Sequence, residues 1–206
     1  MTTYHRPRTL DDALALLAEG GVTVAAGCTD LYPATPAKAL GGPVLDITAV
    51  AGLRGIARGG GGLRIGATTT WTDILRADLP PAFDMLKQAA REVGSVQIQN
   101  AGTIAGNLCN ASPAADGAPC LMALDASVEI ARAGGMRALP LAEFLTGPRR
   151  TALAPGELVT AVTVPETALE GESRFLKLGA RAYLVISIAM VAARLAVREG
   201  RVARAA

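Results

Sequence analysis

The sequence has few of the residues that build metal centres and hydrolytic active sites. It contains one histidine, His5, and three cysteines, Cys28, Cys109 and Cys120, in 206 residues. No two of these cysteines form a CxxC pair, and zinc or iron–sulfur sites need more ligands than this, so we expect no metal in the chain. A single histidine also excludes most Ser-His-Asp and Cys-His mechanisms, and we assign no catalytic residue.

Aromatic residues, clustered charge and long apolar runs are also scarce. Aromatics make up 3% of the chain, and the formal net charge of +2 is spread without a basic stripe. Nucleic-acid-binding surfaces combine such a stripe with stacking aromatics, so nucleic acid is not an expected partner. The longest apolar run, 182–193, is far shorter than the roughly 20 residues that cross a membrane. With no signal-peptide pattern and an odd number of cysteines, the sequence predicts a soluble cytoplasmic protein.

Hydrophobic residues make up 50% of the chain, which is enough for a sizeable core. Their spacing predicts helices over 10–18, 71–75 and 80–94, and strands over 22–26, 44–48, 54–58, 63–70, 127–131 and 157–165. Residues 174–181 and 182–197 fit two strands or a strand and a helix, and the family resemblance given below favours two strands. Thr9 is typical of a helix cap, Thr70 or Thr72 caps the second helix, and glycines 59–62 turn one strand back into the next. The first 50 residues therefore suggest a helix packed on short parallel strands.

Two glycine-bearing segments suit the phosphates of a dinucleotide. In the first loop, VAAGCTDL (24–31), a strand ends at a turn containing Gly27, where successive backbone amides can form a nest for an anion. In the second loop, TIAGN (103–107), we expect small residues to leave backbone amides uncovered. Neither segment is a Walker A loop or a GxGxxG motif. Together they favour a diphosphate held largely by the main chain.

Three longer stretches carry a family resemblance: VAAGCTDLYP, LRIGATTTWTDI and VGSVQIQNAGTIAGNLCNASPAADGAPCLMALDASVEI. They resemble the FAD-binding (medium) subunit of the molybdenum hydroxylases, the family that includes xanthine dehydrogenase and carbon monoxide dehydrogenase. The similarity runs in order from Tyr4 to about Val197, and the third stretch is highly specific.

The resemblance implies an α+β fold, a two-lobed FAD-binding domain of the PCMH or vanillyl-alcohol-oxidase type. It would occupy residues 1–168, with lobes at about 1–55 and 56–168. Residues 172–206 would begin the C-terminal α/β domain that follows in the family. Because family members are commonly longer, we expect this last domain to be incomplete and the chain to be truncated or naturally shortened.

The resemblance also implies which residues bind FAD. The two loops would hold the diphosphate, Asp116 would bond polar atoms of the nucleotide, and the side chains of Val159, Lys177 and Tyr183 would lie near the flavin. The full expected set is Val24, Ala25, Ala26, Gly27, Cys28, Thr29, Asp30, Leu31, Thr103, Ile104, Ala105, Gly106, Asn107, Asp116, Val159, Lys177 and Tyr183.

Two positions depart from the family pattern. The first loop usually carries two successive glycines, and Cys28 replaces the second; the second loop usually reads Gly-Gly-Asn, and Ala105 replaces its first glycine. If either position needs a positive φ, strain on the order of 1 kcal/mol would weaken FAD binding without abolishing it. The sequence also lacks the cysteine-rich insert with which some relatives hold an extra iron–sulfur cluster.

By this resemblance the chain is an electron-transfer subunit. A molybdenum centre in a large partner subunit would oxidise the substrate, and [2Fe–2S] clusters in a small partner subunit would pass the electrons to FAD, which would deliver them to NAD⁺ or another acceptor. Two alternatives remain open: a free-standing flavin oxidoreductase of the same fold, and a flavin-less scaffold or assembly module.

Overall fold

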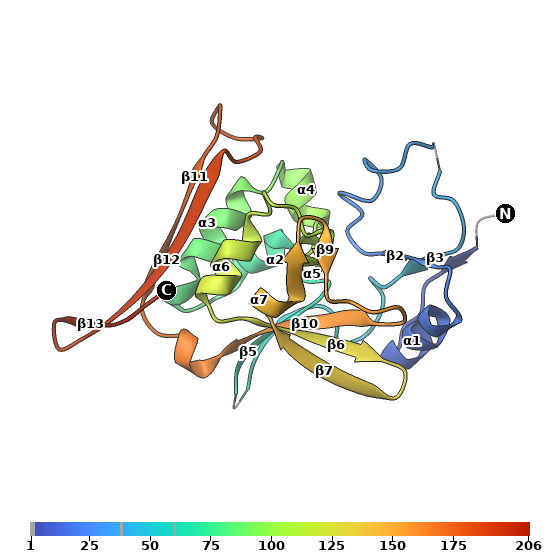
Figure 1. The fold of residues 1–206 in the computed structure, drawn as a ribbon, viewed down its shortest axis with the longest axis horizontal. Helices are drawn as coiled ribbons and strands as arrows, with labels where there is room; N and C mark the ends of the chain where they lie inside the picture. Colours follow the sequence, from blue (N-terminus) through green and yellow to red (C-terminus); the bar gives the residue numbers. More distant parts are fainter. Residues whose placement is uncertain (1–2, 38, 60) are drawn as a thin grey trace.

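The computed structural model describes residues 3–37, 39–59 and 61–206. The N-terminal end is a three-stranded parallel sheet in the order β1-β3-β2, built from β1 (Tyr4–His5), β2 (Thr23–Ala25) and β3 (Val44–Asp46). Helix α1 (Leu10–Glu19) packs on it, and Thr9 Oγ1 accepts a hydrogen bond from the Asp12 amide at 3.2 Å. The expected helix on short parallel strands is therefore confirmed (Figure 1).

The middle of the chain forms a five-stranded antiparallel sheet in the order β4-β5-β10-β6-β7. Its strands are β4 (Ile56–Gly59), β5 (Gly62–Gly66), β10 (Leu158–Pro165), β6 (Ser127–Arg132) and β7 (Gly135–Pro140). Gly59 pairs with Gly62, as the expected hairpin requires, although Gly60 in its turn lies outside the described residues. A two-stranded sheet of β8 (Leu145–Gly147) and β9 (Arg150–Thr151) precedes β10.

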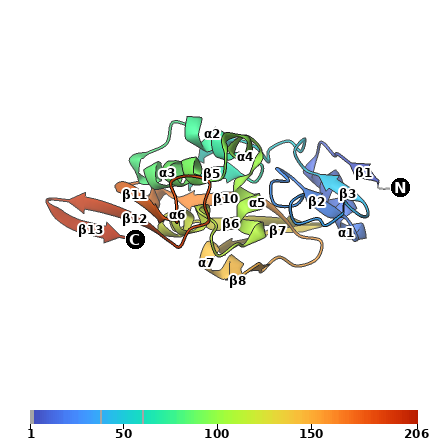
Figure 2. The ribbon, with the colours of Figure 1, turned by 90° about the horizontal axis from the view of Figure 1, so that it is seen from above.

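Helices cover one face of this sheet (Figures 1 and 2). They are α2 (Trp71–Arg76), the 3-10 turn η1 (Pro81–Phe83), α3 (Asp84–Glu92), α4 (Val96–Ala101), α5 (Ile104–Asn110), α6 (Gly117–Ala123) and α7 (Leu141–Phe144). Thr70, not Thr72, caps α2 by accepting from the Asp73 amide. The main core lies between these helices and the sheet, and the smaller core under α1 also includes Ala131 and Leu158 of the middle sheet.

The last segment adds a third sheet, in the order β11-β12-β13, after the 3-10 turn η2 (Glu166–Ala168). Its antiparallel strands are β11 (Glu172–Leu178), β12 (Ala189–Arg198) and β13 (Arg201–Ala205). The sheet packs on α3 and α6, where Ser173 Oγ accepts from the Met85 amide at 2.9 Å and Gln88 Oε1 accepts from the Phe175 amide at 2.7 Å. The domain boundaries at 168 and 172 stay predictions.

Two sequence-based expectations are wrong. The second loop is not a loop, because Thr103 caps α5 and residues 104–107 form its first turn. The strand expected over 182–197 begins only at Ala189, and residues 179–188 form an irregular connection between β11 and β12.

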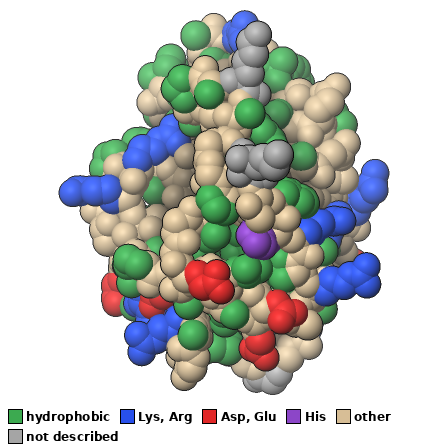
Figure 3. Space-filling model, turned by 90° about the vertical axis from the view of Figure 1, so that its right-hand side faces the viewer, with side chains coloured by type: hydrophobic (Ala, Val, Ile, Leu, Met, Phe, Trp, Pro, Cys, Tyr) green, Lys and Arg blue, Asp and Glu red, His purple; other side chains and the backbone are tan. Residues whose placement is uncertain are grey.

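The distribution of basic side chains on the surface and the length of the helices both bear on which partners are expected. At the N-terminal end, Figure 3 shows basic side chains lying apart around the edge and the single histidine near the middle of the face. Among the described residues, no helix is both long enough and apolar enough to traverse a bilayer.

Candidate functional site

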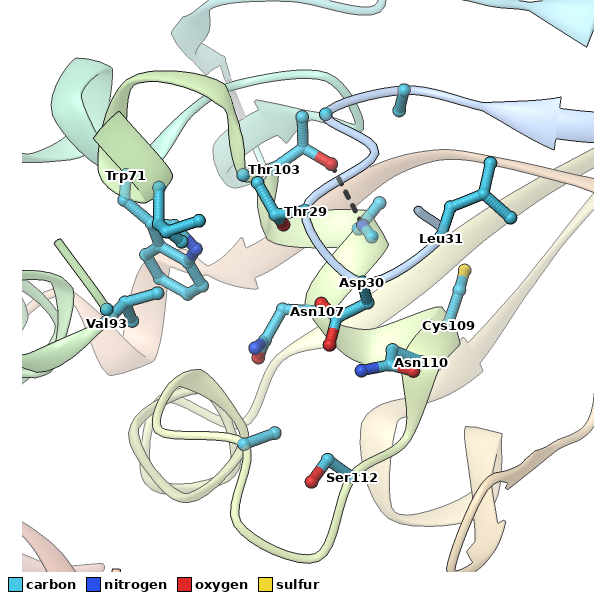
Figure 4. A pocket seen from close by; sticks show the side chains of 18 of the residues that line it. Thr29, Asp30, Leu31, Trp71, Val93, Thr103, Asn107, Cys109, Asn110 and Ser112 are labelled. Atoms are coloured by element: carbon cyan, nitrogen blue, oxygen red, sulfur yellow. Dashed lines mark hydrogen bonds between the residues drawn. The ribbon is translucent and has the colours of Figure 1, made fainter. Parts of the chain in front are cut away.

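A cavity of about 1060 Å³ opens where the three sheets and the helical layer meet. The first loop lines one side, the α3–α4 junction and α5 line another, and residues 184–186, in the connection between β11 and β12, border the rest. In Figure 4, Asp30 from the first loop and Asn107 and Asn110 from α5 project into the same space. Small-molecule sites commonly measure about 300–1,000 Å³, so this cavity has room for a ligand as large as a dinucleotide.

The first loop offers free backbone donors. Within the described part of the chain, none of the backbone amides from Gly27 to Leu31 donates a hydrogen bond. The loop is held against the middle of the chain at Gly27, where an added Cβ would overlap the Ala101 carbonyl. Cys28 follows with a φ of 58°, so the position where the family usually has glycine is left-handed here. The expected strain therefore applies to Cys28.

The second segment offers side chains instead of amides. The Ile104 amide donates to the Thr69 carbonyl at 3.0 Å, the Ala105 amide to Ala67 at 3.2 Å, and the Gly106 amide to Thr103 Oγ1 at 3.1 Å (Figure 4, dashed line). The expectation of uncovered amides is wrong here, because the Thr103 hydroxyl and the carbonyls of Thr69 and Ala67 already accept hydrogen bonds from them. Ala105 lies in the first turn of α5 and carries no left-handed strain.

Two acceptors at the cavity have no partner in the described chain. Asn107 Oδ1 and Asp116 Oδ1 are buried without a hydrogen bond. The other Asp116 oxygen, Oδ2, forms an ion pair with Lys177 Nζ at 2.9 Å, and both side chains are more than 90% buried. Burial raises the pKa of Asp116 above its ordinary value despite this lysine. Buried polar atoms are normally satisfied, so the two oxygens indicate where a ligand would donate hydrogen bonds.

Trp71 forms part of the cavity wall. The side chain is 1% exposed, and a Cβ added at Gly117 would lie 2.5 Å from its indole ring. Gly117 therefore lets the first turn of α6 sit directly against the ring. Val159 on β10 also lines the cavity.

The comparisons with known proteins match this geometry. Residues 1–167 fit the family model for the FAD-binding domain of molybdopterin dehydrogenases. The chain belongs to this family. Its members are FAD-binding subunits of oxidoreductases of the molybdenum hydroxylase type, and FAD is their cofactor.

Relatives of the chain include the medium chain of Sulfolobus acidocaldarius glyceraldehyde dehydrogenase, 34% identical over 79% of this chain and 59% of the relative. The FAD-subunit of Eubacterium barkeri nicotinate dehydrogenase is 34% identical over 90% of this chain and 65% of its own length. The present chain thus spans less than two thirds of these relatives.

Among solved structures, a chain of carbon monoxide dehydrogenase from Oligotropha carboxidovorans matches with a TM-score of 0.91 and 28% identity, over 100% of this chain and 73% of that one. The α+β flavin-subunit fold expected from the resemblance is confirmed.

The structure brings most of the predicted FAD-binding residues to the cavity wall. Three do not line it: Ala25 is buried in β2, Ile104 is buried in the main core, and the Tyr183 side chain is 71% exposed. The remaining residues of the predicted set all line the cavity: Val24, Ala26, Gly27, Cys28, Thr29, Asp30, Leu31, Thr103, Ala105, Gly106, Asn107, Asp116, Val159 and Lys177.

Sequence reasoning missed other parts of the wall. Arg149 lines the cavity and donates to the Asn110 side chain, so the wall includes a cation. Glu157 also lines it, with its carboxylate bound to Arg137 at 2.7 Å. Cys109 is exposed and lines the cavity. The only sequence signal for this part of the wall was the presence of the polar residues Asn110 and Ser112 close to Asp116.

Proposed function

We propose that this chain binds FAD in the cavity and acts as the electron-transfer flavin subunit of a molybdenum hydroxylase. The observation that carries the proposal is the conjunction of free amides in the first loop with two unpartnered acceptor oxygens across the same cavity. A dinucleotide can pair with both sets of groups, because its diphosphate accepts hydrogen bonds from amides and its sugar hydroxyls donate them to acceptor oxygens.

The first loop is the part of the wall suited to the diphosphate. Successive amides from Gly27 to Leu31 present donors at a turn, which is the arrangement that binds anions. Arg149 adds positive charge to the wall, from the β8–β9 turn. Thr103 has its hydroxyl committed to capping α5, so this residue shapes the wall and leaves anion binding to the first loop.

The acceptors suit the hydroxyl groups of the ligand. Asn107 Oδ1 and Asp116 Oδ1 would each accept from a hydroxyl, which removes the cost of leaving a buried oxygen unpaired. Lys177 holds the Asp116 carboxylate in place through its ion pair. Two carboxylates at the wall, Asp116 and Glu157, are thus engaged in ion pairs, which suits a site that binds and positions a cofactor.

FAD, when bound, accepts and releases electrons one or two at a time, and the protein supplies position and exclusion of water. In this proposal the electrons come from [2Fe–2S] clusters of a small partner subunit. A large partner carries the molybdenum cofactor and the substrate site, and NAD⁺ or another acceptor takes the electrons from the flavin. The family membership of the chain and its medium-chain relatives support this role.

The test is a visible absorption spectrum of the purified chain, alone and after adding excess FAD and removing unbound ligand. We expect the absorption bands of a flavin, with FAD rather than FMN released on denaturation. A matched sample of Asn107→Leu/Asp116→Leu, which removes both unpartnered oxygens, should retain much less FAD. A wild-type chain that retains no FAD from a large excess would contradict the proposal and favour the scaffold alternative.

A further inference from the structure

The third sheet has one face that nothing in the described chain covers. Side chains alternate between the two faces of a strand, and Phe175 and Arg194 are buried against the helical layer. The residues that alternate with them project to the other side, which we call the outer face. Its large apolar residues are Leu176 and Leu178 of β11, Val191, Leu195 and Val197 of β12, and Val202 of β13.

These side chains form one apolar patch across the three strands. The opposed pairs on the outer face are Leu176–Val191, Leu178–Ala189, Leu195–Ala205 and Val197–Val202. The large residues among them are 48% to 76% exposed. Monomeric proteins rarely expose an apolar patch larger than a few hundred Å², so this patch indicates a surface that is covered in solution.

The charges of the same strands are placed mainly on the other face. Arg194 and Arg204 both pair with Asp125, at 3.1 and 2.7 Å, on the side of the sheet that faces the helices. Among the described residues of the three strands, the outer face carries only two charged side chains, Glu172 and Arg174, which have opposite sign and lie on the edge strand β11. The centre of the outer face is therefore uncharged.

An uncharged centre favours a second copy of the same chain as the occupant. Homodimer interfaces are the more apolar class of interface, whereas other interfaces are about as apolar as the rest of the surface. A twofold axis brings the same face of both copies together, so a face without central charge opposes no like charges there. The width of the patch, three strands, also suits the roughly 800 Å² that each partner of a stable dimer buries.

We propose that two copies of the chain pack their outer faces together, so that two three-stranded sheets form a sandwich. Sheets that pack in this way lie about 10 Å apart and interdigitate their side chains. The β12–β13 hairpin extends past the helical layer in Figures 1 and 2, which leaves this part of the outer face accessible to a second copy. Lys177, which lines the cavity, projects from the opposite face, so the dimer does not depend on the ligand.

Sedimentation equilibrium of the full chain over a range of concentrations tests the proposal. We expect a mass twice that of the single chain, which falls toward the single-chain mass on dilution. A single-chain mass at every concentration overturns the proposal. A mass that keeps rising above twice the single-chain mass also overturns it, because two outer faces form a closed pair.

A pair of double variants assigns the contact to the outer face. Val191→Glu/Val202→Glu places two charges on each copy and should halve the mass at concentrations where the wild type is a dimer. The matched control, Val96→Glu/Met136→Glu, changes two apolar residues of similar exposure on α4 and β7 and should remain a dimer. A dimer that survives the first double variant, or that is lost in the control, contradicts the proposal.

A cross-link tests the same contact without adding charge to the sheet. Ala193 is exposed on β12, the central strand. A bis-maleimide longer than the roughly 10 Å between packed sheets should join two copies of Ala193→Cys far more than two copies of the wild type, in which Cys109 is exposed. Ala138→Cys, at an exposed position of β7, is the control and should stay at the wild-type level. Equal cross-linking of the two variants contradicts the proposal.

Discussion

At the scale of single residues, the first loop combines free amides with a side chain in an unfavourable conformation. Cys28 has a φ of 58°, and its side chain lines the cavity. A non-glycine residue in this region costs about 1 kcal/mol, because the Cβ approaches the following carbonyl. The cost falls on the native state, since the unfolded chain does not have to adopt this conformation.

Replacing Cys28 by glycine should therefore stabilise the protein by about 1 kcal/mol, measured as a higher urea midpoint. Ala105→Gly is the matched control, because the family usually has glycine at both positions. Ala105 lies in a helical turn, so this change should cost about 1 kcal/mol. Equal effects of the two changes would show that the dihedral angle at Cys28 is not the cause.

The ion pair of Glu157 predicts how the stability of the protein depends on pH. The guanidinium of Arg137 holds the pKa of Glu157 at about 2, below its ordinary value of 4.5. A lowered pKa in the folded state stabilises the protein above the ordinary value, and this contribution is lost as the pH falls toward 2. Glu157→Gln should be less stable than the wild type at pH 7, with the difference in urea midpoint shrinking between pH 4.5 and 2. A difference that stays constant with pH would refute the linkage.

At the scale of elements, one buried arginine helps to attach the third sheet to the helices. Arg194 on β12 is 1% exposed; it donates to the Ala123 carbonyl at the end of α6 at 2.9 Å and to Asp125 at 3.1 Å. Among the described residues no amide donates to this helix-end carbonyl, so the guanidinium satisfies it and attaches the sheet to the helical layer. Burial lowers the pKa of Arg194, but the side chain remains charged at any pH of interest.

Arg194→Leu should reduce the free energy of unfolding by about 2–4 kcal/mol, because it removes hydrogen bonds to buried groups. Arg198→Leu, on the same strand, breaks a pair with Glu170 in which both side chains are exposed, and should have little effect. Chemical denaturation of both variants measures this. Similar losses in the two would mean that the anchor is not Arg194.

Elements were predictable from sequence where a local signal was strong. Thr9 and Thr70 predicted the starts of two helices, because their hydroxyls can cap a helix, and the hairpin glycines predicted a turn. A threonine that can cap a helix is also present at position 103, but the small residues after it favoured a loop, so α5 was not predicted. Short helices such as α4 and α6 gain most of their stability from packing, which a single sequence does not display.

Contacts across the fold were not predictable from local patterns. Lys177 and Asp116 are 61 positions apart, and only the family resemblance placed both at one site. Tyr183 was expected there too, yet its side chain is exposed while its neighbours Leu184 and Ile186 line the wall. The left-handed φ of Cys28 was not predictable either, because composition does not determine a residue's φ.

At the scale of the whole molecule, the cavity exists because the N-terminal part sits close against the helical layer. Gly27 is the point of closest approach, since a side chain there would overlap the Ala101 carbonyl. Gly27→Ala should push the two parts of the cavity wall apart and weaken FAD binding about tenfold, given the usual cost of overpacking. Equilibrium dialysis measures the Kd.

Gly41→Ala is the control, because a Cβ at Gly41 meets nothing and the residue lies away from the cavity. It should bind FAD as the wild type does. If Gly27→Ala also binds normally, the distance between the two parts of the wall does not govern affinity.

The position of Trp71 has an optical consequence. It is the only tryptophan of the chain, and its indole lies in the cavity wall against Gly117. Flavins absorb light in the range where indole emits, so a bound flavin would quench the intrinsic fluorescence of the protein by energy transfer. The chain thus carries its own reporter of occupancy, with no label needed and no second tryptophan to correct for.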